Sequence, residues 1–170
     1  MSDHARALTA QFRQMNADVI QFARECSPDD WRRMVPHEGR SVAYLIDHLV
    51  FGYRTETKAI RAIVTGQEQS LAWDELPPTF TMEELHAMNA KRWEADPYPD
   101  REETIERLRA EGERTAAVLS GLSETDLERT IAFGPVPAMS VAQFIERFVI
   151  GHAGRHLPGI RQELAAASRG

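Results

Sequence analysis

The chain has 170 residues, of which 42% are hydrophobic and 27% charged, a length and composition typical of one globular domain over residues 1–170. No apolar run approaches the roughly 18 residues that a membrane-spanning helix requires, so we expect no membrane partner. The net charge of −6 and the lack of a basic run argue against a nucleic-acid partner, because nucleic acids usually meet a positive surface.

Compartment can be predicted from the amino terminus and from cysteine usage. The first residues lack the basic start and apolar centre of a signal peptide. The single cysteine, Cys26, rules out an internal disulfide and suits a reducing compartment. We therefore expect a cytoplasmic protein.

The first segment is predicted to be an amphipathic helix, because its apolar residues recur at steps of three and four. They are Leu8, Phe12, Met15, Val19, Phe22 and Cys26. Cys26 closes this stripe and is interpreted as a small buried residue, since no adjacent base could activate its thiol. Ser27 and Pro28 suit the cap and first turn of a short helix that extends through Met34.

A second helix is predicted from Ser41, after the loop PHEGR, to Gly66. Its inward stripe comprises Val42, Leu45, Ile46, Leu49, Tyr53, Ile60 and Val64. Residues 67–80 are predicted to be a loop, and loops of this length often carry function.

Two further helices follow from their capping residues. Thr81 and Glu84 form a capping box for a helix to about Ala95, which the prolines of DPYPD end. Asp100 with Glu103 caps the next helix. Its inward face comprises Ile105, Leu108, Gly112, Thr115, Leu119 and Leu122.

The last helix is predicted to begin at Ser140, which Gln143 completes as a capping pair. Its inward face comprises Phe144, Ile145, Phe148, His152 and His156. Pro158 should kink or end this helix near Leu157. Residues 123–139 are predicted to be a connection with one short helical turn, because TIAFGPV, the one segment with β character, is too short for a sheet.

These elements predict an all-α fold with four main amphipathic helices and long connections. One internal echo relates RSVAYLIDHLVFG to MSVAQFIERFVIG. It reflects either two ordinary Ser-capped helix starts or a deeper similarity. In both cases the second and fourth helices enter the bundle with similar phase.

Three histidines are candidates for a metal site. His152 falls on the buried stripe of the last helix, and His156 lies one turn later on the same face. This i, i+4 spacing is the one that metal sites use on helices. His48 lies near the inward face of the second helix, and Gly52 one turn later leaves room for a neighbouring helix or a ligand. Three neutral imidazoles can hold a zinc or nickel ion and leave a coordination position open.

Each histidine also has an ordinary interpretation, as a core residue bonded to a hydroxyl or carbonyl or as a surface residue. The remaining three, His4, His37 and His86, show no such pattern and are predicted to lie on the surface. Asp47 and Glu146 point away from the inward face by helical phase, so neither is expected to be a ligand. Candidate pocket residues are Tyr44, Phe51, Tyr53, Trp93 and Arg155.

With these residues the chain resembles the DinB-like, or YfiT-like, family of metalloenzymes. The resemblance rests on His48 in SVAYLIDHLVFGY and on His152 and His156 in GHAGRHLPGI, with Ile160 four residues later. It covers essentially the whole chain in helix order and length. Pro158 is unusual so close to the histidine pair.

The resemblance implies an up-down-down-up four-helix bundle that binds a divalent metal, zinc or nickel, through His48, His152 and His156. It also implies a homodimer and a small-molecule substrate. Similar proteins include S-transferases and isomerases that use a low-molecular-weight thiol such as mycothiol, bacillithiol or glutathione. No contact with DNA is implied.

Three functional hypotheses follow. In a metal-dependent thiol S-transferase or isomerase, coordination lowers the thiol pKa from about 8.5, and the thiolate attacks an electrophile or an activated double bond. In a metal-dependent hydrolase, the metal lowers the pKa of bound water to about 7. In the third, the protein is a metal-free ligand-binding or stress-related bundle without catalysis.

Overall fold

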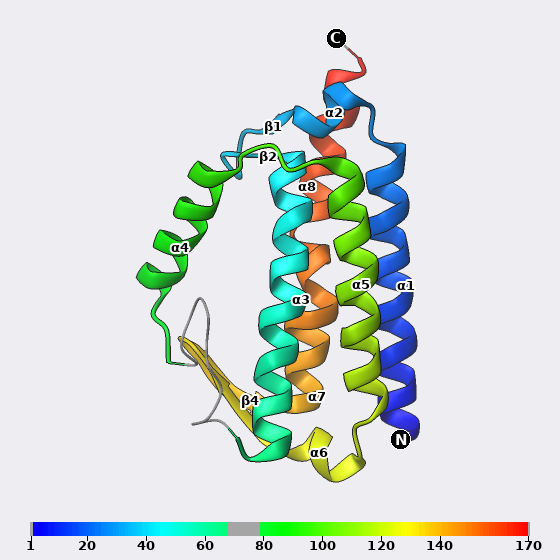
Figure 1. The fold of residues 1–170 in the computed structure, drawn as a ribbon, viewed down its shortest axis with the longest axis vertical. Helices are drawn as coiled ribbons and strands as arrows, with labels where there is room; N and C mark the ends of the chain where they lie inside the picture. The colour runs from blue at the N-terminus through cyan, green and yellow to red at the C-terminus, as the bar shows by residue number, and fades with distance from the viewer. Residues whose placement is uncertain (1, 68–78, 170) are drawn as a thin grey trace.

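Four long helical rods form an up-down-down-up bundle in the computed structural model, which describes residues 2–67 and 79–169 (Figure 1). The rods are α1 (Asp3–Glu25), α3 (Val42–Thr65), α5 (Arg101–Ser120) and a composite of α7 (Val141–Phe144), the π-helix η1 (Ile145–Ile150) and α8 (Gly151–Ala167). The first and fourth rods rise and the second and third descend in Figure 1. The predicted all-α bundle and its arrangement are confirmed.

The rods pack in a closed ring around one hydrophobic core. α5 lies between α1 and α3, and the composite rod lies between α3 and α1. The predicted stripe of α1 is buried apart from the half-buried Met15. The predicted inward face of α5, from Ile105 to Leu122, is also buried. Helical spacing therefore identified the core faces correctly.

Capping residues begin and end the helices largely where the sequence predicts. The Ser41 hydroxyl accepts a hydrogen bond from the Tyr44 N–H at 3.0 Å, which starts α3. Gly66 ends α3 in the left-handed conformation, with φ of 67°. The capping pair at Ser140 is also present at the start of α7.

The short helix after α1 is shorter than predicted. α2 (Pro28–Arg32) has the expected Ser27 cap but ends before Met34. Met34 lies instead in the strand β1 (Met34–Val35), which pairs antiparallel with β2 (Arg40–Ser41). In this extended segment the Val35 side chain is fully buried in the core.

The connection before the last helix is also more ordered than predicted. After α6 (Glu124–Glu128), the strands β3 (Thr130–Phe133) and β4 (Val136–Ser140) form an antiparallel hairpin that turns at Gly134. The prediction that TIAFGPV could make no sheet was wrong. Ile131 is buried against the end of the bundle, so tertiary packing stabilises a hairpin that would be marginal alone.

The internal echo extends beyond two shared caps. In both halves a long helix is followed by a short helix, a hairpin and a Ser-capped helix. The Val42 N–H donates to the Arg33 carbonyl at 2.9 Å, and the Val141 N–H donates to the Arg129 carbonyl at 2.8 Å. Equivalent hydrogen bonds thus fix the entry of α3 and of the fourth rod into the bundle.

α4 (Met82–Ala95) lies beside the bundle and buries no residue fully (Figure 1). Its predicted capping box between Thr81 and Glu84 is present. The Tyr44 hydroxyl ties it to α3 by donating to the Asn89 carbonyl at 2.7 Å. The predicted loop at 67–80 falls largely outside the described residues.

Pro158 does not end the last helix, contrary to one of the two predicted outcomes. α8 continues through it to Ala167. Ile160 is fully buried, and Leu157 and Leu164 pack against the core. This packing holds the helix together although the proline removes one backbone hydrogen bond. None of the described helices is both long and apolar enough to cross a membrane.

Candidate metal centre

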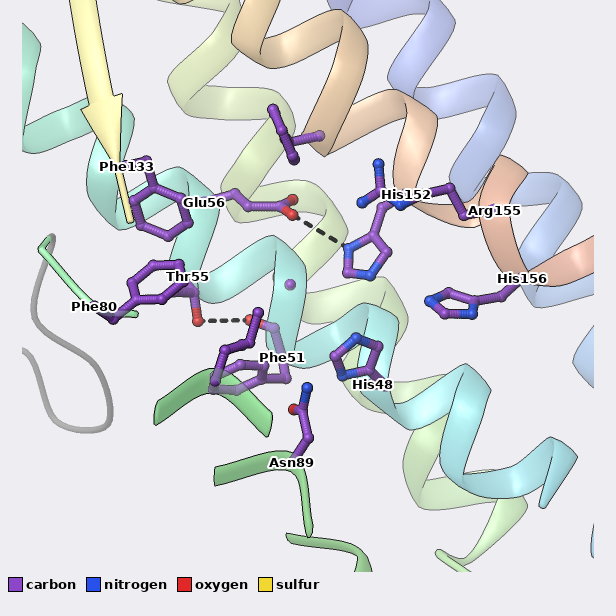
Figure 2. A pocket seen from close by; sticks show the side chains of 13 residues that line it. His48, Phe51, Thr55, Glu56, Phe80, Asn89, Phe133, His152, Arg155 and His156 are labelled. Atoms are coloured by element: carbon purple, nitrogen blue, oxygen red, sulfur yellow. Dashed lines mark hydrogen bonds and ion pairs between the residues drawn. The ribbon is translucent and has the colours of Figure 1, made fainter. Parts of the chain in front are cut away.

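The three predicted histidines converge between α3 and α8 (Figure 2). The ring centroid of His48 lies 4.9 Å from that of His152 and 5.6 Å from that of His156. The two rings on α8 are 5.4 Å apart. One ring nitrogen of each histidine lies within 4.8 Å of the others, so the group can hold a metal ion.

The π-helix η1 sets the phase of the two histidines on α8. Its wider turn is closed by a hydrogen bond from the Gly151 N–H to the Glu146 carbonyl, five residues back. As a result Val149 takes the fully buried position. Phe148, predicted on the inward face, is half-buried and lines a cavity instead. The sequence prediction assumed α-helical spacing throughout, which missed this shift.

Two carboxylates stand behind the histidines on α8. Glu56 Oε1 lies 3.2 Å from Nδ1 of His152, and Glu38 Oε1 lies 2.9 Å from Nδ1 of His156. The Nε2 atom of each ring is therefore the one left for an ion. Metal-binding histidines commonly direct their other ring nitrogen to a carboxylate in this way, which fixes the ring and its tautomer.

Gly52 provides the space for the His152 ring, as its small size predicted. A Cβ atom at Gly52 would lie 2.5 Å from Nδ1 of His152. The sequence analysis overlooked Glu56, although His48, Gly52 and Glu56 share one face of α3 at i, i+4 and i+8. Glu38 lies in the turn between β1 and β2, where no periodic pattern could identify it.

Burial keeps the imidazoles of His48 and His152 in the neutral form that binds metals. It lowers the pKa of His48 well below its usual value. Burial, with the nearby charge of Arg155 and then His156, lowers the pKa of His152 to about 3. It also raises the pKa of Glu56 to about 8, although Arg155 opposes this shift. At neutral pH without a cation, Glu56 and His152 are thus both largely uncharged, and their 3.2 Å contact is not an ion pair.

The residues present fit a divalent cation. Neutral imidazole nitrogens are ligands that zinc and nickel accept, and three of them leave coordination positions open. Nδ1 of His48 is buried without a hydrogen-bond partner. Glu38 and Glu56 lie behind two of the three rings, and a cation bound between the rings would favour the ionised form of Glu56.

A cavity of about 240 Å³ lies beside the triad. Its wall is mainly aromatic and includes Phe51, Phe80, Phe133 and Phe148. The polar side chains of Thr55, Asn89 and Arg155 also line it (Figure 2). The sequence analysis missed all of these except Phe51 and Arg155; Phe80, Asn89 and Phe133 come from segments far from the triad in the sequence.

Three predicted pocket residues do not line the cavity. Tyr44 stacks against His48, with ring centroids 6.3 Å apart. Trp93 packs edge-on against Tyr44 at 5.3 Å. Tyr53 is fully buried in the core, where its hydroxyl meets the Met15 sulfur at 3.4 Å. Tyr44 and Trp93 thus support the site from behind, and Tyr53 is a core residue.

The residues set aside from the sequence lie where predicted. His4, His37 and His86 are exposed. Cys26 is buried, and burial, reinforced by the charge of Asp30, raises the pKa of its thiol to about 11, which opposes a nucleophilic role.

The two acidic residues set aside also lie away from the triad. Asp47 pairs with Arg107 at 2.7 Å and Arg92 at 3.4 Å. Glu146 is exposed. Neither belongs to the group that could hold a metal.

This arrangement defines a helical-bundle protein with a candidate metal site of three histidines beside an apolar cavity. The family model of the DinB superfamily matches residues 11–158, which include all three histidines, and the chain belongs to this superfamily. The resemblance inferred from the sequence is therefore confirmed. No match was found among curated proteins or among solved structures.

Proposed function

We propose that the protein is a divalent-metal-dependent enzyme that activates a low-molecular-weight thiol for S-transfer or isomerisation of a small substrate. The observation that carries the proposal is the convergence of three imidazoles beside an apolar cavity, two of which, His48 and His152, are kept neutral by burial. Zinc and nickel are the cations we expect, with His48, His152 and His156 as ligands. Membership of the DinB superfamily supports metal binding.

The chain supplies a preorganised and largely apolar site for this chemistry. When bound, a divalent cation at such a site acts as a Lewis acid that favours the thiolate over the thiol. A hydrogen bond to Glu38 orients the ring of His156, and Glu56 contacts the ring of His152 at 3.2 Å. The aromatic wall keeps water from the substrate, which strengthens electrostatic interactions inside the cavity.

Metal titration tests the ligand assignment. Zinc and nickel are titrated into the wild type and into His48→Ala, His152→Ala and His156→Ala, with the exposed His86→Ala as the matched control. Loss of an orienting partner lowers metal affinity roughly 10- to 100-fold. Each triad variant should lose more affinity than this, and His86→Ala should bind the metal like the wild type. Unchanged affinity in all three triad variants would overturn the proposal.

A thiol-conjugation screen tests the reaction. The metal-loaded protein is offered mycothiol, bacillithiol or glutathione with a panel of electrophiles. We expect product only when thiol and metal are both present. Turnover without thiol would favour the metal-dependent hydrolase. The metal content of protein purified without an affinity tag tests the third hypothesis. If this protein holds no metal and gains none on reconstitution, the result would favour the metal-free ligand-binding bundle.

The homodimer remains a prediction from the family resemblance, and sedimentation velocity tests it.

A further inference from the structure

The cavity beside the triad is small and its wall is predominantly apolar. Its volume of about 240 Å³ lies below the roughly 300–1,000 Å³ of pockets that hold drug-sized ligands. Phe80 and Phe133 pack edge to face with centroids 5.0 Å apart and form one side. Phe51 and Phe148 contribute further aromatic surface. An occupant must therefore be a compact molecule with a substantial apolar part.

Arg155 adds a positive charge to this apolar space. Among the described residues it is the one arginine or lysine that lines the cavity, and no carboxylate of the described chain forms an ion pair with it. Its guanidinium donates one hydrogen bond, to the Arg147 carbonyl at 3.0 Å, and lies 5.4 Å from the centre of the Phe148 ring. These contacts hold the group in place while other N–H donors stay available.

Arg155 is an exposed residue that borders the interior of the site. Figure 2 shows its side chain beside His152. His152 and Glu56 line the same cavity as Arg155 and lie on opposite sides of the space between α3 and α8. Glu56, the one acidic residue that lines the cavity among the described residues, faces His152 and so does not neutralise the guanidinium by direct contact.

We infer that the cavity binds a small, largely apolar molecule with a single carboxylate, which Arg155 recognises. A guanidinium pairs with a carboxylate through two parallel hydrogen bonds. A phosphate would bring about two negative charges against this one cation. The inference deepens the proposed function, because the carboxylate-bearing molecule would be the electrophile to which the thiol adds. Only this role as electrophile rests on the proposed function.

Calorimetric titration of two probes with the same carbon skeleton tests this recognition. Hydrocinnamate carries the carboxylate and hydrocinnamyl alcohol lacks it. Both are titrated into zinc-free full-length protein, so that neither binds through a metal and the result is independent of the metal-site proposal. We expect hydrocinnamate to bind about tenfold more tightly than the alcohol, equivalent to roughly 1.4 kcal/mol.

Two arginine variants make the assignment specific. Arg155→Gln should abolish the preference for the carboxylate, and Arg155→Lys should restore part of it. Arg147→Gln is the matched control, because its guanidinium also lies 5.4 Å from the Phe148 ring but does not line the cavity. It should keep the wild-type preference. Equal affinities for both probes in the wild type, a preference that survives Arg155→Gln, or binding of neither probe would overturn the inference.

Discussion

Substitution of Gly52 by alanine should disrupt the candidate metal site without removing any of the proposed ligands. The new Cβ atom would lie 2.5 Å from Nδ1 of His152, whereas ordinary van der Waals contact begins at 3.4 Å. The ring must therefore move by about 0.9 Å, the difference between these two distances. Metal–ligand distances are typically held within about 0.2 Å, so a shift of this size breaks the coordination geometry.

The effect on stability should be small because two contributions oppose each other. Replacing glycine by alanine inside a helix stabilises a protein by about 1 kcal/mol. Overpacking a well-packed interior costs about 1–3 kcal/mol. The free energy of unfolding of Gly52→Ala should therefore fall by about 0–2 kcal/mol, which leaves a folded protein. Its zinc affinity should fall at least 10- to 100-fold, the loss expected when a ligand is misoriented.

Gly154→Ala is the matched control on α8. A Cβ atom there meets nothing within 4 Å. This variant should gain about 0.5–1 kcal/mol in the free energy of unfolding and bind zinc like the wild type. Zinc affinity comes from competition with a chromogenic chelator, and stability from urea denaturation. Wild-type zinc affinity in folded Gly52→Ala would refute the conclusion that the close fit of His152 against α3 organises the site.

Three further predictions concern the outer carboxylates, the bound ion and the buried thiol. Glu38→Gln and Glu56→Gln should each reduce zinc affinity about 10- to 100-fold, while the exposed Glu83→Gln should not, as measured by the same chelator competition. Zinc at about 100 times its dissociation constant should add about 2.7 kcal/mol to the free energy of unfolding, and thermal denaturation of His156→Ala should show no such gain. Because burial raises the pKa of Cys26 from 9.0 to about 11, the folded protein keeps the proton that the unfolded chain releases, so stability should fall as pH rises from 9 toward 11. Urea denaturation across this range, with Cys26→Ala as control, checks the sign; a pH-independent difference between the two proteins contradicts it.

The bundle could be predicted because its helices follow simple rules of spacing and capping. The stripes of α1 and α5 lie on their buried faces, and Ser41 and Ser140 cap the helices they were expected to cap. The triad could be predicted for the same reason. His152 and His156 share a face through i, i+4 spacing, and that face had to turn inward because its neighbours are apolar.

The rest of the site depends on tertiary packing, which local patterns do not encode. Glu38 reaches His156 from a turn far away in the sequence, at 2.9 Å. Phe80 and Phe133 pack together on one side of the cavity, although they come from segments on either side of α4 and α5. The hairpin that carries Phe133 was missed because its strands are stabilised by the bundle rather than by their own propensity. Glu56 is different, because its i, i+8 spacing from His48 could have identified it as a site residue from the sequence.

The π-helix explains why the internal echo produces only one site. Ile46 and its counterpart Ile145 are both fully buried, so the two halves share a phase up to the start of η1. Beyond η1 the match resumes one residue later, with Ile60 and Ile160 both fully buried. In this shifted register Gly52 becomes the counterpart of His152, and these are the residues that meet where α3 passes α8.

The shift therefore pairs a residue without a side chain on one rod with a ring on the other. Without the extra residue of η1, His152 would correspond to Tyr53, whose side chain fills the core. Two large side chains would then take equivalent positions. The His152 ring would no longer occupy the space beside Gly52. Only the fourth rod carries the histidine pair, because α3 has no matching π-helix. On α3, Gly52 and Glu56 lie against the His152 imidazole. The π-helical turn of η1, which α3 lacks, thus gives two similar halves different faces and leaves one candidate metal centre.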